Sequence, residues 1–122
     1  MGYESKFYVV NKTTQKSLDG KRYWAEVIAS FDLCKVYAVS DPIRNKYKAT
    51  DAYIYADDGN TEIIEDNYGD PLIEIPIDVM IQLMEKVITS ENYYRRYNPF
   101  LQMLKGFNKD DWENLVVLHY GH

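Results

Sequence analysis

The spacing of apolar residues changes from period two to a helical period near residue 76, and this change constrains the fold more than any other feature. Before it, the β-rich segments DAYIYA, TEIIED and PLIEIP are separated by the turn signals DDGN and NYGD. After it, in PIDVMIQLMEKVITS, one helical face carries Val79, Met80, Leu83, Met84, Val87 and Ile88. The pattern predicts a three-stranded antiparallel meander followed by an amphipathic helix that Asp78 can cap.

Two β-rich segments precede the meander. SKFYVVNKT predicts a first strand, and the polar run NKTTQKSLDGK after it supplies turn residues. Residues 23–37 carry apolar side chains at both strand and helix spacing, so periodicity leaves both alternatives open. Their aromatic and β-branched content favours a long strand, with a helix as the rival.

The last third of the chain predicts further helices and a closing strand. Ser90 can cap a helix that the Asn98-Pro99 pair interrupts, because a residue before proline avoids the helical conformation. A short helix then ends at Gly106, and LVVLHY is typical of a buried strand. We therefore expect one compact α+β domain over residues 1–122, an antiparallel β-sheet (meander) with two or three helices packed on one face.

Charge and cysteine usage exclude several protein classes. The net charge is −5, and nine Lys/Arg against five Asp/Glu in residues 1–50 become five against fourteen in residues 51–122. Such an acidic chain is a poor general DNA binder, because Lys and Arg supply most non-specific affinity for phosphates. The lone Cys34 excludes an internal disulfide and favours a reducing compartment. No run of 18 apolar residues occurs, so we expect a cytoplasmic protein without a membrane partner.

The chain carries none of the usual catalytic or metal-binding motifs. It has no nucleophile elbow, phosphate-binding loop, HExxH motif or dinucleotide fingerprint. His119 and His122 are too few ligands for zinc, which wants three or four. A calcium loop starting at Asp58 would need glycine and glutamate where the chain has Ile63 and Gly69. We expect no enzyme, cofactor or metal, and keep a small hydrolase using dispersed carboxylates as a lesser alternative.

The segment YYRRY is the best candidate binding site. On a helix, Tyr93 and Tyr97 share one face, with Arg96 three positions after Tyr93. Tyr94 and Arg95 lie about 100° from those neighbours. Arginine can bind a phosphate and tyrosine can stack on a base, so the cluster suits a nucleotide. The competing interpretation is that Tyr94 and Tyr97 pack into the core while the arginines pair with carboxylates.

Several segments together resemble small uncharacterised proteins encoded by phages and prophages of Gram-positive bacteria. These are GYESKFYVV, WAEVIASFDLCKV, DDGNT, YRRY and LVVLHYGH. The resemblance spans nearly the whole chain and implies a setting in which small accessory proteins counter host defence by binding. It carries over no catalytic residue.

The leading functional hypothesis is a non-enzymatic protein that sequesters a small nucleotide immune signal. Arg95 and Arg96 are the phosphate ligands, and Tyr93, Tyr94 and Tyr97 stack on the base. Secondary ligand candidates are Lys105 and His119. We expect a homo-oligomer, since a pocket shared between subunits can enclose a ligand.

The alternative is a direct inhibitor of a host defence protein. The acidic side chains of the segment ADDGNTEIIEDNYGD can imitate nucleic-acid phosphates and occupy a basic groove. They are Asp57, Asp58, Glu62, Glu65, Asp66 and Asp70.

Overall fold

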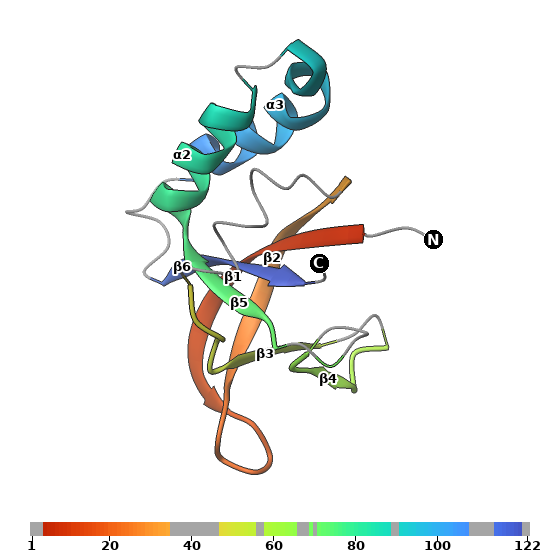
Figure 1. Cartoon of the computed structure of the whole chain (residues 1–122). Helices are drawn as coiled ribbons and strands as arrows, with labels where there is room; N and C mark the ends of the chain where they lie inside the picture. Colours follow the sequence, from red (N-terminus) through yellow and green to blue (C-terminus); the bar gives the residue numbers. More distant parts are fainter. Residues whose placement is uncertain are drawn as a thin grey trace.

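The computed structural model describes residues 4–34, 47–55, 58–65, 69, 71–88, 91–107 and 114–120. Within these ranges the chain forms a six-stranded mixed sheet and two helices (Figure 1). The elements in chain order are β1 (Glu4–Lys16), β2 (Tyr23–Cys34), β3 (Ala52–Tyr55), β4 (Glu62–Ile63), β5 (Ile73–Pro76), α2 (Ile77–Ile88), α3 (Glu91–Gly106) and β6 (Leu115–Tyr120). The α+β class and the mostly antiparallel sheet agree with the sequence prediction.

The strands lie in the order β4-β3-β2-β1-β6-β5, and only β2 and β3 pair in parallel. The strand interpretation of residues 23–37 is confirmed over β2, while residues 35–37 lie outside the described ranges. β1 continues through the polar residues that we predicted to form a turn. Lys12 pairs with Ala25, and the Thr13 hydroxyl donates to the Trp24 carbonyl at 2.7 Å. The turn therefore begins only at Ser17, because cross-strand bonds outweigh the weak β-propensity of this segment.

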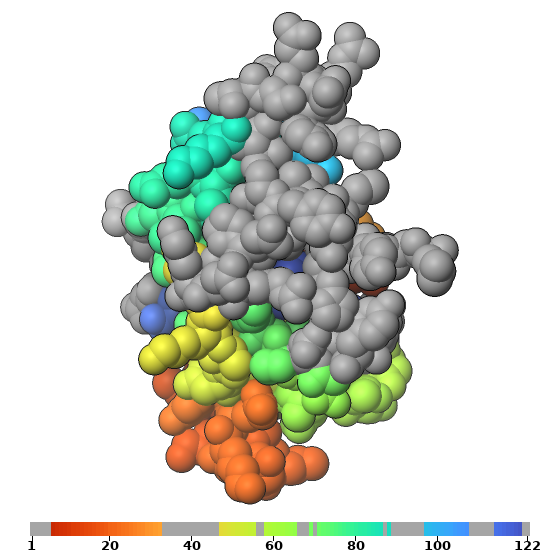
Figure 2. Space-filling model, viewed as in Figure 1, coloured from red at the N-terminus to blue at the C-terminus, as the bar shows by residue number. Residues whose placement is uncertain are grey.

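Helices α2 and α3 cover one face of the sheet. Phe7, Val9 and Val117 project from β1 and β6 into this layer and are buried. Among the described side chains of the two helices, six are buried in this layer, namely Met80, Met84, Tyr97, Phe100, Leu101 and Leu104. The helices and the β1–β2 loop lie at opposite ends of the molecule (Figure 2).

The other face of the sheet curls around a second, smaller core. This core consists of Val10, Ala25, Ala52, Ile54, Leu72 and Leu118. Residues 48–51 connect the start of β5 to the start of β2 around this core. On one side Thr50 N donates to Leu72 O at 2.8 Å, and on the other Tyr23 N donates to Asp51 O at 3.1 Å. Because these bonds connect β5 to the start of β3, the sheet closes into a small barrel. We call this closed sheet the barrel.

Strict alternation along β1 separates the two cores. Phe7 and Val9 face the helices, whereas Tyr8 and Val10 belong to the barrel interior. Lys6 continues the interior row toward one end of the barrel. Lys12 continues this row toward the other end of the barrel. Its Nζ lies 3.0 Å from the carboxylate of Asp51, just before β3, and 3.0 Å from the carboxylate of Glu74 on β5. One strand therefore carries a cation near each end of the barrel.

Residues 91–106 form one helix, although we predicted an interruption at Asn98-Pro99. Pro99 lies inside α3 on its exposed side. The buried residues of α3 follow the spacing i, i+3, i+4, i+7 across the proline, at positions 97, 100, 101 and 104. Proline inside a helix costs about 3 kcal/mol. Burial of four large side chains offsets that cost. Rules based on local sequence do not include this burial free energy.

The predicted meander is correct only for its first two strands. β3 and β4 form the expected hairpin, with Ile54 opposite Ile63. β5 instead pairs with β6 at the other end of the strand order. Only the residues before it touch the β4 side, where Leu72 N donates to Ile64 O at 3.4 Å. β6 lies between β1 and β5 in the strand order, and the partner of a strand depends on long-range pairing that the local turn signal NYGD does not encode.

Candidate functional site

Most of the predicted YYRRY site falls on side chains that the structure does not describe. The backbone of residues 93–96 belongs to α3. The side chains of Tyr93, Tyr94, Arg95 and Arg96 lie outside the described part. Their contacts with a ligand stay a prediction.

The other three predicted ligand residues do not form one surface. Tyr97 is 2% exposed and packs in the core under the helices, as the packing interpretation expected for this residue. His119 is also 2% exposed, and its ring stacks on Phe7 with the ring centroids 4.8 Å apart. Lys105 is exposed on α3, with its Nζ 4.0 Å from Glu85 of α2. Two of the three side chains therefore support the core.

The acidic hairpin uses one of its carboxylates to build its own turn. Asp58 Oδ1 accepts from the backbone N–H groups of Asn60 at 2.8 Å and Thr61 at 2.9 Å. Oδ2 accepts from the Thr61 hydroxyl at 2.6 Å, and Gly59 supplies the positive φ of 73° that the turn requires. These hydrogen bonds, led by that of the Thr61 hydroxyl, lower the pKa of Asp58 to about 2. Asp57, Asp66 and Asp70 lie outside the described ranges.

Asp58 should make the stability of the hairpin depend on pH in acid. Its folded pKa lies below the ordinary value of 3.8, so its contribution is present above pH 4 and is lost as the pH falls through about 2. We expect Asp58→Ala to lower the melting temperature at pH 6 but not at pH 2, measured by circular dichroism. Glu65→Gln, at another exposed carboxylate of the same segment, is the control. An equal effect of Asp58→Ala at both pH values would contradict this role.

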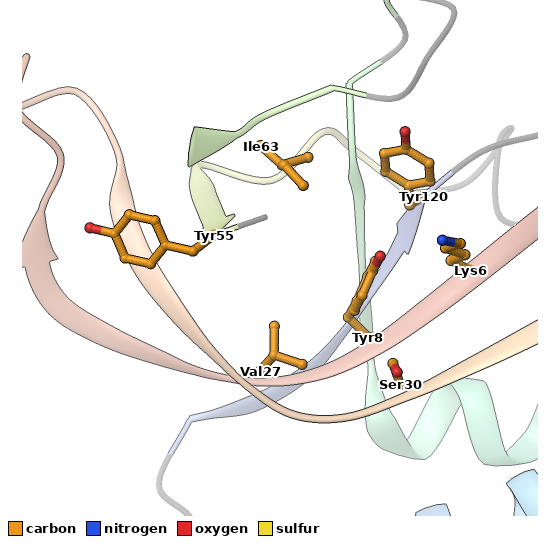
Figure 3. A pocket seen from close by; sticks show the side chains of 7 residues that line it. All are labelled: Lys6, Tyr8, Val27, Ser30, Tyr55, Ile63 and Tyr120. Atoms are coloured by element: carbon orange, nitrogen blue, oxygen red, sulfur yellow. The ribbon is translucent and has the colours of Figure 1, made fainter. Parts of the chain in front are cut away.

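A pocket of about 330 Å³ lies near one end of the barrel, between β4 and the inner face of the sheet (Figure 3). We call it the tyrosine pocket. Seven residues from five strands line it: Lys6, Tyr8, Val27, Ser30, Tyr55, Ile63 and Tyr120. Register explains the convergence of the side chains, since Lys6 lies opposite Tyr120 and Tyr8 lies opposite Ser30 on neighbouring strands.

Aromatic contacts position the rings of the pocket. Tyr8 and Tyr120 meet edge to face, with ring centroids 6.5 Å apart and an interplanar angle of 88°. Tyr55 contacts the Trp24 ring at 6.1 Å and the Tyr53 ring at 5.4 Å. The hydroxyls of Tyr53 and Tyr55 lie 3.4 Å apart, and this hydrogen bond, with burial and nearby negative charge, raises the pKa of Tyr53 to about 12.

The described lining of the pocket carries one positive charge, and carboxylates lie nearby. Lys6 is the one charged residue among the seven that line it, and it forms no ion pair with any residue in the described ranges. Asp32 lies opposite Lys6 on β2 and is exposed. Glu62 lies opposite the pocket residue Tyr55 in the pairing of β3 with β4. One cation with carboxylates nearby can attract a single small anion, while further negative charge meets repulsion.

Sequence reasoning missed the tyrosine pocket because its residues are far apart along the chain. The local signal was present in β1, where Lys6 and Tyr8 alternate with Phe7 and Val9. That alternation indicates which residues share a face of the strand. It does not indicate that the face carrying Lys6 becomes concave. Curling of the sheet and the position of β4 decide this point.

Within the described residues, no group of three His, Cys, Asp or Glu side chains could hold a metal ion. The two described helices are both too short or too polar to span a membrane. Comparison of the chain with protein-family models, with curated proteins and with solved structures found no match. Any functional assignment therefore depends on the chemistry of the site.

Proposed function

We propose that this protein is a non-enzymatic binding protein for a small nucleotide, and that the ligand occupies the tyrosine pocket. The observation that carries the proposal is the pocket itself, which combines three tyrosines, a lysine and two aliphatic side chains in about 330 Å³. Pockets for small molecules typically have volumes of about 300–1,000 Å³ and contain a few placed polar groups that orient the ligand. A nucleotide needs a surface for a planar base and a partner for phosphate, and the pocket offers both.

The base has an apolar surface available to it. Val27 and Ile63 come from opposite sides of the pocket, and Tyr8 lies beside them on β1 (Figure 3). Val27 is 40% exposed, which is unusual for a large aliphatic residue in this protein. A stacked or enclosed base would bury it. Stacking on an aromatic side chain contributes about 1–3 kcal/mol per base, without strong sequence preference.

The phosphate has a cation and hydroxyl groups available to it. The ammonium of Lys6 lies at one side of the pocket, with the Tyr120 side chain above it in Figure 3. The Ser30 hydroxyl also lines the pocket. A hydrogen bond to a charged group contributes about 1.5–3 kcal/mol. With one stacked ring the sum is about 2.5–6 kcal/mol, which corresponds to a dissociation constant between about 10 mM and tens of micromolar.

Sequestration is the proposed role of this binding. The resemblance to phage proteins motivates it, because a phage protein present in excess can lower the free concentration of a host signalling nucleotide. The function needs no catalytic group. Arg95 and Arg96 remain candidates for additional phosphate contacts, and their variants are part of the test below.

Isothermal titration calorimetry with the four common nucleoside monophosphates tests the proposal. For the tightest of the four, Lys6→Met should weaken binding at least tenfold, about 1.4 kcal/mol, because the phosphate loses its cation. Lys48→Met is the matched control, since Lys48 is exposed and does not line the pocket. Circular dichroism should show that both variants keep the fold.

Variants of α3 separate the pocket from the YYRRY segment. If Arg95→Ala or Arg96→Ala abolishes binding while Lys6→Met does not, the ligand binds on α3 and the pocket assignment is wrong. If none of the four nucleotides binds to the wild-type protein at millimolar concentration, the nucleotide proposal itself fails.

A further inference from the structure

We infer that the tyrosine pocket is selective for a nucleoside monophosphate, and that it discriminates against nucleoside triphosphates and against linked dinucleotides. This inference rests on the proposed function and specifies the ligand of the same site. Three observations lead to it: the volume of the pocket, the number of cations that line it, and the position of carboxylates beside it.

The volume limits the size of the ligand. At about 330 Å³ the pocket lies at the lower end of the range for small-molecule sites. It has room for one base with one sugar and phosphate. A second nucleotide would have to leave the pocket and lie on the outer surface, without the enclosing side chains that give the first one its contacts.

The charges limit the number of phosphates. Lys6 can neutralise about one negative charge, and it is the single cation among the described residues that line the pocket. At neutral pH a nucleoside monophosphate carries about two negative charges and a triphosphate about four, so the triphosphate leaves about two more charges without a cation. Asp32 lies opposite Lys6, and Glu62 lies opposite the pocket residue Tyr55 in the β3–β4 register, so additional phosphates approach carboxylates. Charges within about 8 Å interact at physiological ionic strength, and like charges repel.

The arrangement of the lining residues also orients the ligand. Lys6 and Tyr120 are opposite each other in the β1–β6 register, whereas Val27 lies opposite Val10, four residues farther along β1. This separation corresponds to about 13 Å along a strand. It places the phosphate at the Lys6 end and the base at the Val27 and Ile63 end. A nucleoside without phosphate would leave Lys6 unused.

The test is a calorimetric series with adenosine, AMP, ADP and ATP at constant ionic strength and without divalent cations. If the monophosphate of another base binds most tightly in the first screen, the nucleoside and the mono-, di- and triphosphate of that base replace the adenine series. We expect the monophosphate to bind at least tenfold more tightly than the nucleoside and at least tenfold more tightly than the triphosphate. In Lys6→Met the advantage of the monophosphate over the nucleoside should disappear.

A second variant tests the carboxylates. Asp32→Asn removes one negative charge without changing the size of the side chain, and should reduce the penalty on ATP severalfold while changing AMP affinity less. Gln102→Glu, an exposed charge change on α3, is the control for a general effect of net charge.

The outcomes separate the inference from the proposed function. If the triphosphate binds as tightly as the monophosphate or more tightly, the inference is wrong and the nucleotide site remains. If the nucleoside alone binds as tightly as the monophosphate, the assigned role of Lys6 is wrong and so is the selectivity. If no member of the series binds, the proposed function fails as well.

Discussion

Replacing Phe100 by alanine should lower the free energy of unfolding by about 3–5 kcal/mol, the usual range for a buried phenylalanine. Phe100 is fully buried, and its ring stacks on Phe31 with centroids 4.9 Å apart and an interplanar angle of 11°. It also contacts Phe7 at 5.6 Å. One side chain therefore joins α3 to both β1 and β2, and its truncation leaves a cavity at the centre of the larger core.

Urea denaturation followed by circular dichroism measures this effect. The matched control is Gln102→Ala on the exposed side of the same helix, which should change stability by no more than about 0.5 kcal/mol. Helix propensity changes little between the two variants, so the difference reports packing. A loss below about 1 kcal/mol for Phe100→Ala would show that α3 does not pack on the sheet as described.

Replacing Lys12 by methionine should lower the free energy of unfolding by about 2–3 kcal/mol, because two carboxylates lose their common cation in a partly buried place. Lys12 Nζ lies 3.0 Å from Asp51 and 3.0 Å from Glu74, and its side chain is 26% exposed. Glu74 also accepts from the Thr50 hydroxyl at 2.8 Å. The network joins β1, β5 and the segment before β3, which are the elements that close the barrel.

The pH dependence distinguishes the ion pairs from simple packing. Burial alone would lower the pKa of Lys12, but the hydrogen bonds and charges of Asp51 and Glu74 outweigh it and raise the pKa above its ordinary value of 10.5. A raised pKa means that the contribution is complete below pH 10.5 and is lost as the pH rises through the folded pKa. The difference between wild type and Lys12→Met should therefore be constant from pH 7 to 10 and shrink above that range.

Lys48→Met serves as the control for Lys12→Met, since it removes an exposed cation from the neighbouring segment. Chemical denaturation at several pH values provides the measurement. An Lys12→Met variant as stable as wild type at pH 7 would mean that the two ion pairs do not hold the barrel closed.

Local patterns were enough to predict most of the elements. The β-rich composition of β1, the hairpin of β3 and β4, and the helical spacing of Met80 and Met84 each depend on side chains close together in sequence. A strand or an amphipathic helix repeats every two or about 3.6 residues, so a short window contains the information. The predictions failed at Pro99 and at β5, where packing against distant residues outweighed the local preference.

The candidate site depended much more on tertiary structure. From the sequence alone, tyrosine and basic side chains were the candidates for ligand binding. Tyr97 was predicted to lie on a helix, with packing in the core as the competing interpretation. The sequence did not bring Lys6, Tyr8 and Tyr120 together, because strands β1 and β6 meet only through long-range pairing. Hydrogen bonds of residues 48–51 to the β5 side and to the start of β2 then close that sheet into the barrel. The period of a strand is local, but its partner, its register and its curvature are set by the whole chain.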